Sequence, residues 1–165
     1  MKNKKLRLLV QTALFAAIIT VATMIIQIPI PGGGYVHPGD SVILLCAWLL
    51  GPIPGAVAGA VGAGLADLLS GYALYLPATV LIKALMGLCA GALFTRLSNR
   101  TTGRLLGGTV AGLVMVLGYF LYEAFVLGLG LGAVASVPAN LFQALFGLAA
   151  GAALLRPMGR LLRTK

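Results

Sequence analysis

The stretch SVILLCAWLLGPIPGAVAGAVGAGLADLLS, residues 41–70, decides the topology of this chain. It is apolar almost throughout, and its one clear break is GPIPG at residues 51–55. Because proline lacks the backbone N–H that a helix interior needs, the stretch is either one kinked helix or two short helices that meet at Pro52 and Pro54. The residues on either side of the stretch are needed to choose between these alternatives.

The composition identifies the class of protein. The chain has 165 residues, of which 60% are hydrophobic and 9% charged, and its mean hydropathy is +1.04. Soluble domains have about 25% charged residues, and a soluble domain this apolar could not cover its surface with polar groups. We therefore predict an all-α integral membrane protein that forms a single membrane domain over residues 1–165.

The basic residues favour an even number of membrane spans. The formal charge is +9, and the cations cluster at residues 2–7, 96–104 and 156–165. Positively charged loops stay in the cytoplasm, and five spans would place the third cluster outside, whereas six place all three clusters inside. With about 20 apolar residues per span, we predict a six-transmembrane-helix bundle with both termini cytoplasmic. The predicted spans are residues 8–28, 39–52, 54–70, 76–96, 105–127 and 137–155.

Several other functions are disfavoured by the sequence. The first apolar run is too long for a signal peptide and has no A-x-A cleavage site, so we expect it to be retained. Cys46 and Cys89 both lie in apolar runs, which indicates buried thiols rather than a disulfide or a metal pair. The motifs G-x-x-x-x-G-K-[ST], H-E-x-x-H and G-x-S-x-G do not occur, so we predict neither an enzyme nor a cofactor in this chain. The long apolar gaps between the basic clusters argue against nucleic-acid binding.

Five polar side chains inside the predicted spans fall in the outer half of the membrane. At 1.5 Å per residue, Lys83 and Gln143 lie about 9 Å from the outer ends of their spans, Glu123 about 6 Å, and Asp67 and Asn140 about 5 Å. The middle of the hydrocarbon core is about 15 Å deep. Each buried charge costs about 2.5–3.5 kcal/mol, so several in one layer indicate a cavity that opens to the outside.

Some of these polar residues share a helix face. Asn140 and Gln143 are three residues apart, and Tyr119 and Glu123 are four apart. The loop before the second span also carries polar residues, and it could cover the cavity. The predicted substrate-binding residues are Tyr35, His37, Asp40, Tyr75, Lys83, Tyr119, Glu123, Asn140 and Gln143.

Structural roles are the alternative for most of these residues. Lys83 could neutralise Glu123 or Asp67, and Asp67 could serve a helix end or an interhelical contact. Asp40 precedes the second span and is suited to an N-cap, while His37 could be a solvated loop residue. Aromatic residues at the membrane interface form belts, a role that is open to Trp48, Tyr72 and Tyr75.

Small residues recur at every fourth position and predict close helix packing. The rows are Gly51, Gly55, Gly59, Ala63 and Asp67; Gly147 and Gly151; and Ala13 and Ala17. The last row, with Ala16, could also present a smooth face to a separate protein.

The order of these features is similar to that of a known family. GDSVILLCAWLLGPIPGAVAGAVGAGLADLLSGYALYLPATVLIKALMG, residues 39–87, resembles the substrate-binding S components of energy-coupling-factor (ECF) vitamin transporters, and within them the hydroxymethylpyrimidine/pyridoxine-type subgroup. The resemblance extends over nearly the whole chain. It is carried by Gly39-Asp40, Leu50-Gly51-Pro52, the block from Ala66 to Tyr72, Pro77-Ala78-Thr79 with Lys83, and Pro138-x-Asn140-x-x-Gln143.

The resemblance implies a function and partners. It implies a vitamin site near the outer surface of a prokaryotic cell-membrane protein, and assembly with a transmembrane coupling subunit and two cytoplasmic ATPases. ATP would then be used by those partners, and the S component would topple in the membrane to carry its ligand inward. Ala13-x-x-x-Ala17 matches the contact motif of the family's first helix.

Three hypotheses follow. In the first, the chain captures pyridoxine or an aminopyrimidine: Glu123 or Asp40 accepts from a ring nitrogen or amine, and Lys83 meets a hydroxyl or phenolate oxygen. Asn140 and Gln143 would bond hydroxymethyl groups in that site, and Tyr119 would stack on the ring. The second is a stand-alone proton-coupled carrier that uses Asp67 and Glu123, and the third is a scaffold without a ligand.

Overall fold

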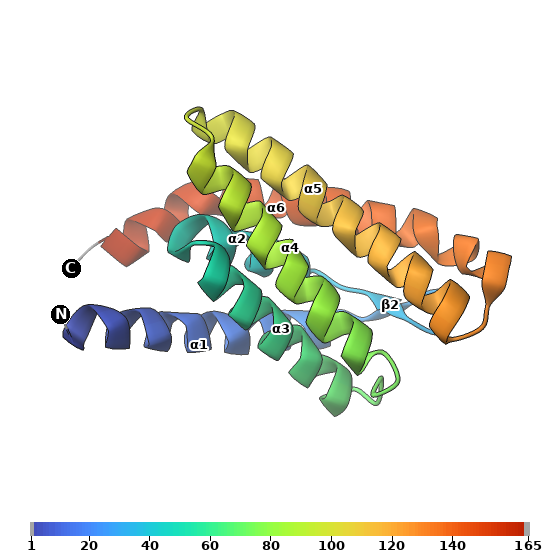
Figure 1. Ribbon diagram of the computed structural model, residues 1–165. Coiled ribbons are helices and arrows are strands. Elements are labelled where there is room, and N and C mark those ends of the chain that lie inside the picture. Colours follow the sequence, from blue (N-terminus) through green and yellow to red (C-terminus); the bar gives the residue numbers. More distant parts are fainter. Residues whose placement is uncertain (1, 164–165) are drawn as a thin grey trace.

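The computed structural model describes residues 2–163, which form a helical bundle (Figure 1). Lys165, part of the third predicted basic cluster, lies outside the described residues. The helices are α1 (Lys2–Ile25), α2 (Gly39–Leu50), α3 (Pro52–Leu69), α4 (Leu76–Arg96), α5 (Arg100–Leu121) and α6 (Val137–Arg163). The shorter elements are strands β1 (Ile28–Pro29) and β2 (Tyr35–Val36), the π-helical turn η1 (Tyr122–Val126) and the 3₁₀ helix η2 (Gly130–Ser136).

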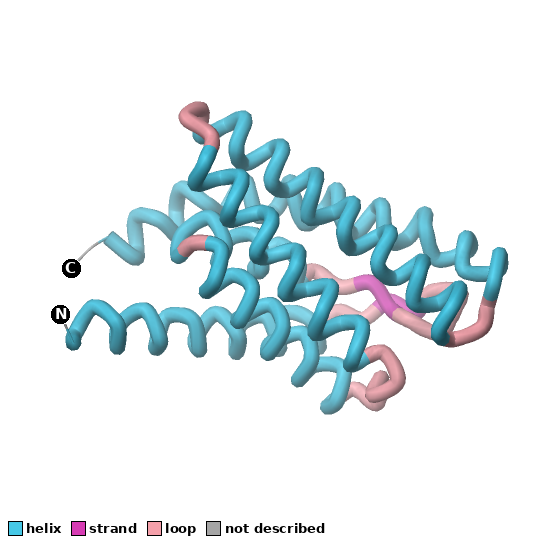
Figure 2. The backbone as a smooth tube through the Cα atoms, viewed as in Figure 1, coloured by secondary structure: helices cyan, strands magenta, loops and turns pink. Residues whose placement is uncertain are grey.

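Successive helices run up and down, so the bundle has two distinct ends (Figures 1 and 2). We call one the basic end: it holds the start of α1, the α2–α3 and α4–α5 turns, and the last turns of α6. The other is the hairpin end, with the β1–β2 hairpin, the α3–α4 turn, η1 and η2. The two ends of the described chain lie together, as the even number of spans predicts. That the basic end faces the cytoplasm remains a prediction from charge.

The break at residues 51–55 separates two helices. Gly51 has φ 104°, which glycine adopts without strain, and the chain reverses there. Pro52 and Pro54 lie in the first turn of α3, where proline is tolerated because those N–H groups need no helical acceptor. The two-helix alternative is therefore confirmed. Helix α2, with 12 residues, is about 18 Å long and shorter than a full span, whereas five helical segments are long and apolar enough to cross a membrane.

Several predicted span boundaries differ from the helix ends. The sixth span was expected to end at residue 155, but α6 continues to Arg163. The first span was expected to continue to residue 28, but α1 ends at Ile25 because the chain turns into the hairpin. The fifth was expected to begin at residue 105, but α5 begins at Arg100. Asn99 caps it by accepting hydrogen bonds from the N–H groups of Thr101 (2.9 Å) and Thr102 (3.2 Å).

Small residues lie where helices cross, as their spacing predicts. A Cβ added at Gly87 of α4 would lie 2.3 Å from the carbonyl carbon of Gly55 in α3, so the two backbones are in direct contact. Likewise, a Cβ at Gly62 would lie 2.6 Å from the carbonyl oxygen of Ala16 in α1. These contacts bring α3 close to both neighbours, and α3 and α4 pack extensively.

The apolar core fills the bundle between its two ends. Its main cluster includes Ile82, Met86, Ala111 and Met115 together with Trp48, whose side chain is only 5% exposed. The suggested belt position of Trp48 is therefore wrong, because the indole is turned inward. Both cysteines are free thiols; Cys46 is buried and Cys89 half-buried.

Candidate functional site

Lys83 lies on α4 and forms a salt bridge with Asp40 of α2, with Nζ 2.6 Å from Oδ1. Both side chains are buried. The predicted partners of Lys83, Glu123 and Asp67, were wrong. The N-cap role suggested for Asp40 was also wrong: it is the second residue of α2, and its carboxylate accepts from Lys83 instead of capping the helix. A buried carboxylate needs such a partner, because an unpaired charge is costly in an apolar surrounding.

The salt bridge belongs to a larger polar network. Gln143 of α6 donates to Asp40 Oδ2 (2.7 Å), and its Oε1 accepts from the backbone N–H of His37 (2.7 Å). The Met115 sulfur of α5 lies 3.3 Å from Lys83 Nζ and 3.2 Å from Gln143 Nε2. We call His37, Asp40, Lys83, Met115 and Gln143 the charge network. It connects four helices to the loop that follows the hairpin.

His37 is buried, so the solvated alternative was wrong. Its Nδ1 accepts from the N–H of Gly39 (3.2 Å) and lies 3.3 Å from Oγ1 of Thr23. Burial lowers the pKa of His37 to about 4; the charge of Asp40 raises it, and that of Lys83 lowers it further. The imidazole is therefore neutral at pH 7, and because Nδ1 is an acceptor, the proton is on Nε2.

A small cavity lies beside this network, beneath the hairpin. We call it the hairpin cavity. Its volume is about 20 Å³, room for about one water molecule, so a ring-shaped ligand requires its walls to move. The residues that line it are Ile30, Gly34, Tyr35, His37, Asp67, Tyr75, Thr79, Tyr119, Glu123 and Asn140.

Asp67, near the end of α3, provides one carboxylate of the cavity. Oδ1 accepts from the hydroxyl of Tyr35 (2.7 Å), whereas Oδ2 is buried and makes no hydrogen bond with the described residues. Burial, followed by the hydrogen bond to Asp67, raises the pKa of Tyr35, which therefore stays a donor. The Tyr72 ring is half-buried and packs on Tyr35, with 4.4 Å between ring centroids. Asp67, which lines the cavity, thus has one carboxylate oxygen without a donor among the described residues.

Glu123, in η1, provides the second carboxylate. Oε2 accepts from Ser136 (2.5 Å), and Oε1 accepts from Tyr75 (3.3 Å). The Tyr75 hydroxyl also donates to the carbonyl of Gly32 (2.8 Å) in the hairpin turn, so Tyr75 is buried rather than placed in an aromatic belt. Gly32 has φ 103°, and a Cβ there would lie 3.4 Å from Oε2 of Glu123. Glu123 therefore fastens η2 and the hairpin over the cavity. No lysine or arginine of the described residues forms a salt bridge with either cavity carboxylate.

Tyr119 connects the cavity to the charge network. Its hydroxyl is 3.1 Å from Oγ1 of Thr79, and its ring centroid is 5.4 Å from Nζ of Lys83. Asn140 reaches the cavity from α6, whereas Gln143, one turn along, is used by the network. Two amides on one helix face thus have different surroundings.

The structure divides the predicted binding residues into two groups. Those that line the cavity are Tyr35, His37, Tyr75, Tyr119, Glu123 and Asn140; those that lie behind it are Asp40, Lys83 and Gln143. Direct contact of any of them with a substrate stays a prediction. Sequence reasoning gave Asp67 a structural role, or a proton-relay role in the carrier hypothesis, but did not place it among the substrate-binding residues, and it missed Thr79. Thr79 precedes Lys83 by four residues, so its helical position was a signal that it shares the face of Lys83.

The predicted partner-binding row is exposed. Ala13 and Ala17 face away from the bundle on α1, while Ala16 is buried against α3 near Gly62. The exposed small-residue row is therefore narrower than the sequence suggested, because Ala16 belongs to a contact within the chain.

The fold and the site define a class: a multi-pass membrane protein with a small polar cavity near one end of an apolar helical bundle. The same fold is present in a solved structure of the S component of a bacterial ECF transporter. The two chains superpose with a TM-score of 0.72 and 23% sequence identity, over 99% of each chain.

The family model for the S component of ECF-type riboflavin transporters matches residues 3–160, so this chain belongs to the S components of ECF transporters. It is a subunit of a membrane transport system, and its family is not one of enzymes. Among relatives, an uncharacterised protein from Pyrococcus woesei is 42% identical over 138 residues, 82% of this chain and 90% of that protein. The thiamine precursor transporter HmpT of Lactococcus lactis is 30% identical over 149 residues, 89% of this chain and 84% of HmpT. The latter similarity supports the hydroxymethylpyrimidine-type subgroup.

Proposed function

We propose that this chain captures a small vitamin or vitamin precursor, a heterocycle like hydroxymethylpyrimidine or pyridoxine, from the outer face of the membrane. ATP-driven uptake would follow in a complex with a coupling subunit and two ATPases. The observation that carries this proposal is the lining of the hairpin cavity, where two carboxylates that form no salt bridge meet several tyrosines and an asparagine.

The cavity walls suit an aromatic ring that carries hydrogen-bond donors. Oδ2 of Asp67 is an acceptor that lacks a donor, and Glu123 offers a second carboxylate to an exocyclic amine or a protonated ring nitrogen. The amide of Asn140 is suited to a hydroxymethyl group. Tyr35 and Tyr119 offer ring faces for stacking.

The size of the cavity favours a single-ring ligand. Because the cavity has a volume of only about 20 Å³, a single ring requires fewer side chains to move than the three fused rings of a flavin. The relative described as a thiamine precursor transporter supports a pyrimidine, whereas the family model is named for riboflavin. Both substrate classes therefore belong in the test.

In this proposal the charge network positions the cavity walls. Lys83 lies under the ring of Tyr119, and Gln143 bonds the backbone of His37, so Asp40, Lys83 and Gln143 act on a ligand through these two cavity residues. This replaces the direct ligand contacts expected from the sequence with an indirect role.

The coupling partners would bind elsewhere on the molecule. Ala13 and Ala17 form an exposed small-residue row on α1, a surface that a helix of the coupling subunit could approach closely. The positive-inside rule would place the hairpin cavity on the outer side and the basic end near the cytoplasmic ATPases.

Calorimetric titration of the purified chain tests this function. We expect binding of an aminopyrimidine or pyridoxine, weakened about tenfold or more by Asp67→Asn and by several-fold for Asn140→Ala. Thr95→Ala is the matched control, because Thr95 bonds only carbonyls of its own helix, near the basic end. Equal affinities for parent and both cavity variants, or tight binding of riboflavin alone, would contradict the proposed site or substrate. Mass spectrometry of co-purifying small molecules provides an independent identification.

The stand-alone carrier has one observation in its favour: Asp67 and Glu123 line the same cavity. However, an apolar core cluster around Met86 and Ala111 lies between this cavity and the basic end, which disfavours a proton path through the described residues. Vesicles that contain only this chain distinguish the two. Gradient-driven uptake without ATPases would support the carrier and contradict the subunit.

A further inference from the structure

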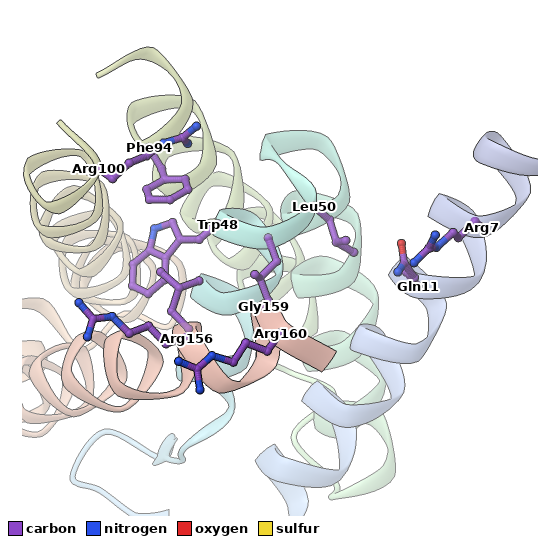
Figure 3. A pocket seen from close by; sticks show the side chains of 11 residues that line it. Arg7, Gln11, Trp48, Leu50, Phe94, Arg100, Arg156, Gly159 and Arg160 are labelled. Carbon is purple, nitrogen blue, oxygen red and sulfur yellow. The ribbon is translucent and has the colours of Figure 1, made fainter. Parts of the chain in front are cut away.

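The cations of this chain gather away from the hairpin cavity. A larger cavity at the basic end is lined by arginines from three segments, Arg7, Arg100, Arg156 and Arg160 (Figure 3). The segments that include the hairpin end, residues 8–95 and 105–155, contain a single lysine or arginine, Lys83. The hairpin cavity therefore has at most one basic side chain to balance its carboxylates.

Three carboxylates share the hairpin end with that one cation. They belong to Asp40, Asp67 and Glu123, the only acidic residues of the chain. Lys83 forms its salt bridge with Asp40, over 2.6 Å, so this pair carries no net charge, and His37 is neutral at pH 7. Asp67 and Glu123, which line the cavity, therefore give its walls an excess of negative charge when they are ionised.

Within the described residues, the side chains that hydrogen-bond these two carboxylates are neutral hydroxyls. Asp67 accepts from Tyr35, and Glu123 accepts from Ser136 and Tyr75. A hydroxyl replaces a water molecule but supplies no opposite charge. Asp67 is only 3% exposed, and its Oδ2 has no donor among the described residues. A buried carboxylate oxygen in this position is best compensated by a donor that also carries positive charge.

The aromatic part of the lining suits the same kind of ligand. Tyr35, Tyr75 and Tyr119 all line the cavity, and the ring centroids of Tyr75 and Tyr119 are 6.4 Å apart. Ring faces attract cations, as Lys83 shows with its Nζ 5.4 Å from the centroid of Tyr119. Tyrosine rings combined with carboxylates form the surroundings in which proteins bind organic cations.

We propose that the hairpin cavity binds its ligand as an organic cation, with a protonated ring nitrogen or amine that donates to Oδ2 of Asp67. This inference rests on the proposed function, because it specifies the charge of the ligand in the same cavity. A heterocycle that is neutral in water takes up a proton from the solvent as it binds, and the new N–H bond supplies the donor. A neutral flavin would leave both carboxylates uncompensated.

Two small probes of nearly the same shape separate charge from fit. 4-Aminopyridine is a cation at neutral pH because its ring nitrogen is strongly basic, whereas aniline is neutral. The rise in melting temperature of the purified chain is measured over a range of concentrations of each probe. We expect 4-aminopyridine to bind about tenfold more tightly than aniline. Equal affinities, a preference for aniline, or no stabilisation by either probe would overturn the inference.

One variant assigns the preference to the carboxylate of Asp67. Asp67→Asn keeps the shape of the side chain and removes its charge, so the affinity for 4-aminopyridine should fall about tenfold, while that for aniline should change by less than about twofold. Thr95→Ala is the control and should keep the full preference, because Thr95 bonds only carbonyls of its own helix. An undiminished preference in Asp67→Asn would contradict the inference, and the comparison of the two probes in the parent chain needs no variant.

Nitrogen NMR measures the charge of a bound vitamin precursor directly. The purified chain is saturated with an aminopyrimidine that carries a hydroxymethyl group and isotope-labelled ring nitrogens, at a pH where the free ligand is neutral. Protonation moves the resonance of a ring nitrogen far upfield, so the bound ligand should show the protonated resonance. Binding with the neutral resonance would overturn this inference and leave the proposed function intact. Conversely, a preference for 4-aminopyridine without binding of any vitamin precursor would contradict the proposed function and leave the cation site.

Discussion

The hairpin end and the basic end of this bundle differ in how their charged side chains are placed. At the hairpin end, Asp40 and Lys83 are buried and paired, within a network completed by Gln143. At the basic end, exposed cations such as Lys4 and Arg96 gather with no carboxylate side chain nearby.

The difference follows from the two surroundings. A charge enclosed among apolar helices is tolerated only when a partner and hydrogen bonds compensate for lost water, so the hairpin end is built from exact donor–acceptor pairs. A guanidinium at the membrane surface keeps its water or contacts lipid headgroups, and needs no partner within the protein. Charge at the hairpin end therefore holds the fold, whereas charge at the basic end is expected to orient the bundle in the membrane.

The largest predicted effect is on stability, and it tests whether a buried charge at the hairpin end depends on its partner while a charge at the basic end does not. Lys83→Met removes the cation from a buried carboxylate and should lower the free energy of unfolding by about 3–5 kcal/mol, measured by reversible unfolding in detergent. Arg96→Met at the basic end is the control and should change it by less than about 0.5 kcal/mol.

A double variant separates the charge from the packing of the side chain. Lys83→Met combined with Asp40→Asn leaves no uncompensated charge, so it should regain most of the lost stability. If the single variant were as stable as the parent, Asp40 would not depend on Lys83, and the contrast between the ends would fail.

The second effect is the pH dependence of stability at the hairpin end. His37 has its pKa lowered from 6.5 to about 4, so between these values the unfolded chain binds a proton that the folded chain does not. Stability should therefore be constant above about pH 6.5 and fall by up to about 3 kcal/mol as the pH drops to 4.

Asp40 and Lys83 are the charged groups nearest His37, so the comparison is made with His37→Asn, which keeps both. Asn can accept from the N–H of Gly39 as Nδ1 does, but it does not titrate. The slope between pH 4 and 6.5 should be smaller in this variant. An unchanged slope would show that another group causes it.

The third effect is on stability and concerns the place where α3 and α4 cross. Both helices run between the hairpin end and the basic end. Gly87→Ala would place a Cβ 2.3 Å from the backbone of Gly55, and the forced separation should cost about 1–3 kcal/mol. Gly132→Ala in η2 is the control, since its Cβ would meet only Leu129 at 4.0 Å. Thermal unfolding of the two variants measures the difference, and equal melting temperatures would contradict direct backbone contact.

The smallest effect on stability is predicted on the lipid-facing side of α1. Ala17→Trp adds a large side chain to an exposed position, so folding and ligand binding should be unchanged, while uptake by the assembled transporter should be lost. Leu106→Trp, at an exposed position of α5, should retain uptake. Loss of ligand binding by Ala17→Trp would show that α1 contributes to the site rather than to partner contact.

Much of the architecture could be predicted from the sequence because it depends on local patterns. Length and hydropathy predicted the helices, and the charge clusters predicted that the two ends of the chain lie at the same end of the bundle, as they do for the described residues. The two prolines after Gly51 indicated where α2 ends and α3 begins. The layer of polar residues located the site at one end, since helical rise converts sequence position into depth.

The pairing of the polar groups was decided only by the tertiary structure. Depth alone could not show that Lys83 pairs with Asp40 rather than Glu123, because that depends on how α2 and α4 are rotated toward each other. For the same reason, Asn140 and Gln143 share a helix face but only Asn140 lines the cavity. A sequence determines which side chains lie on each face of a helix. The rotation and packing of neighbouring helices then determine which of these side chains contact one another.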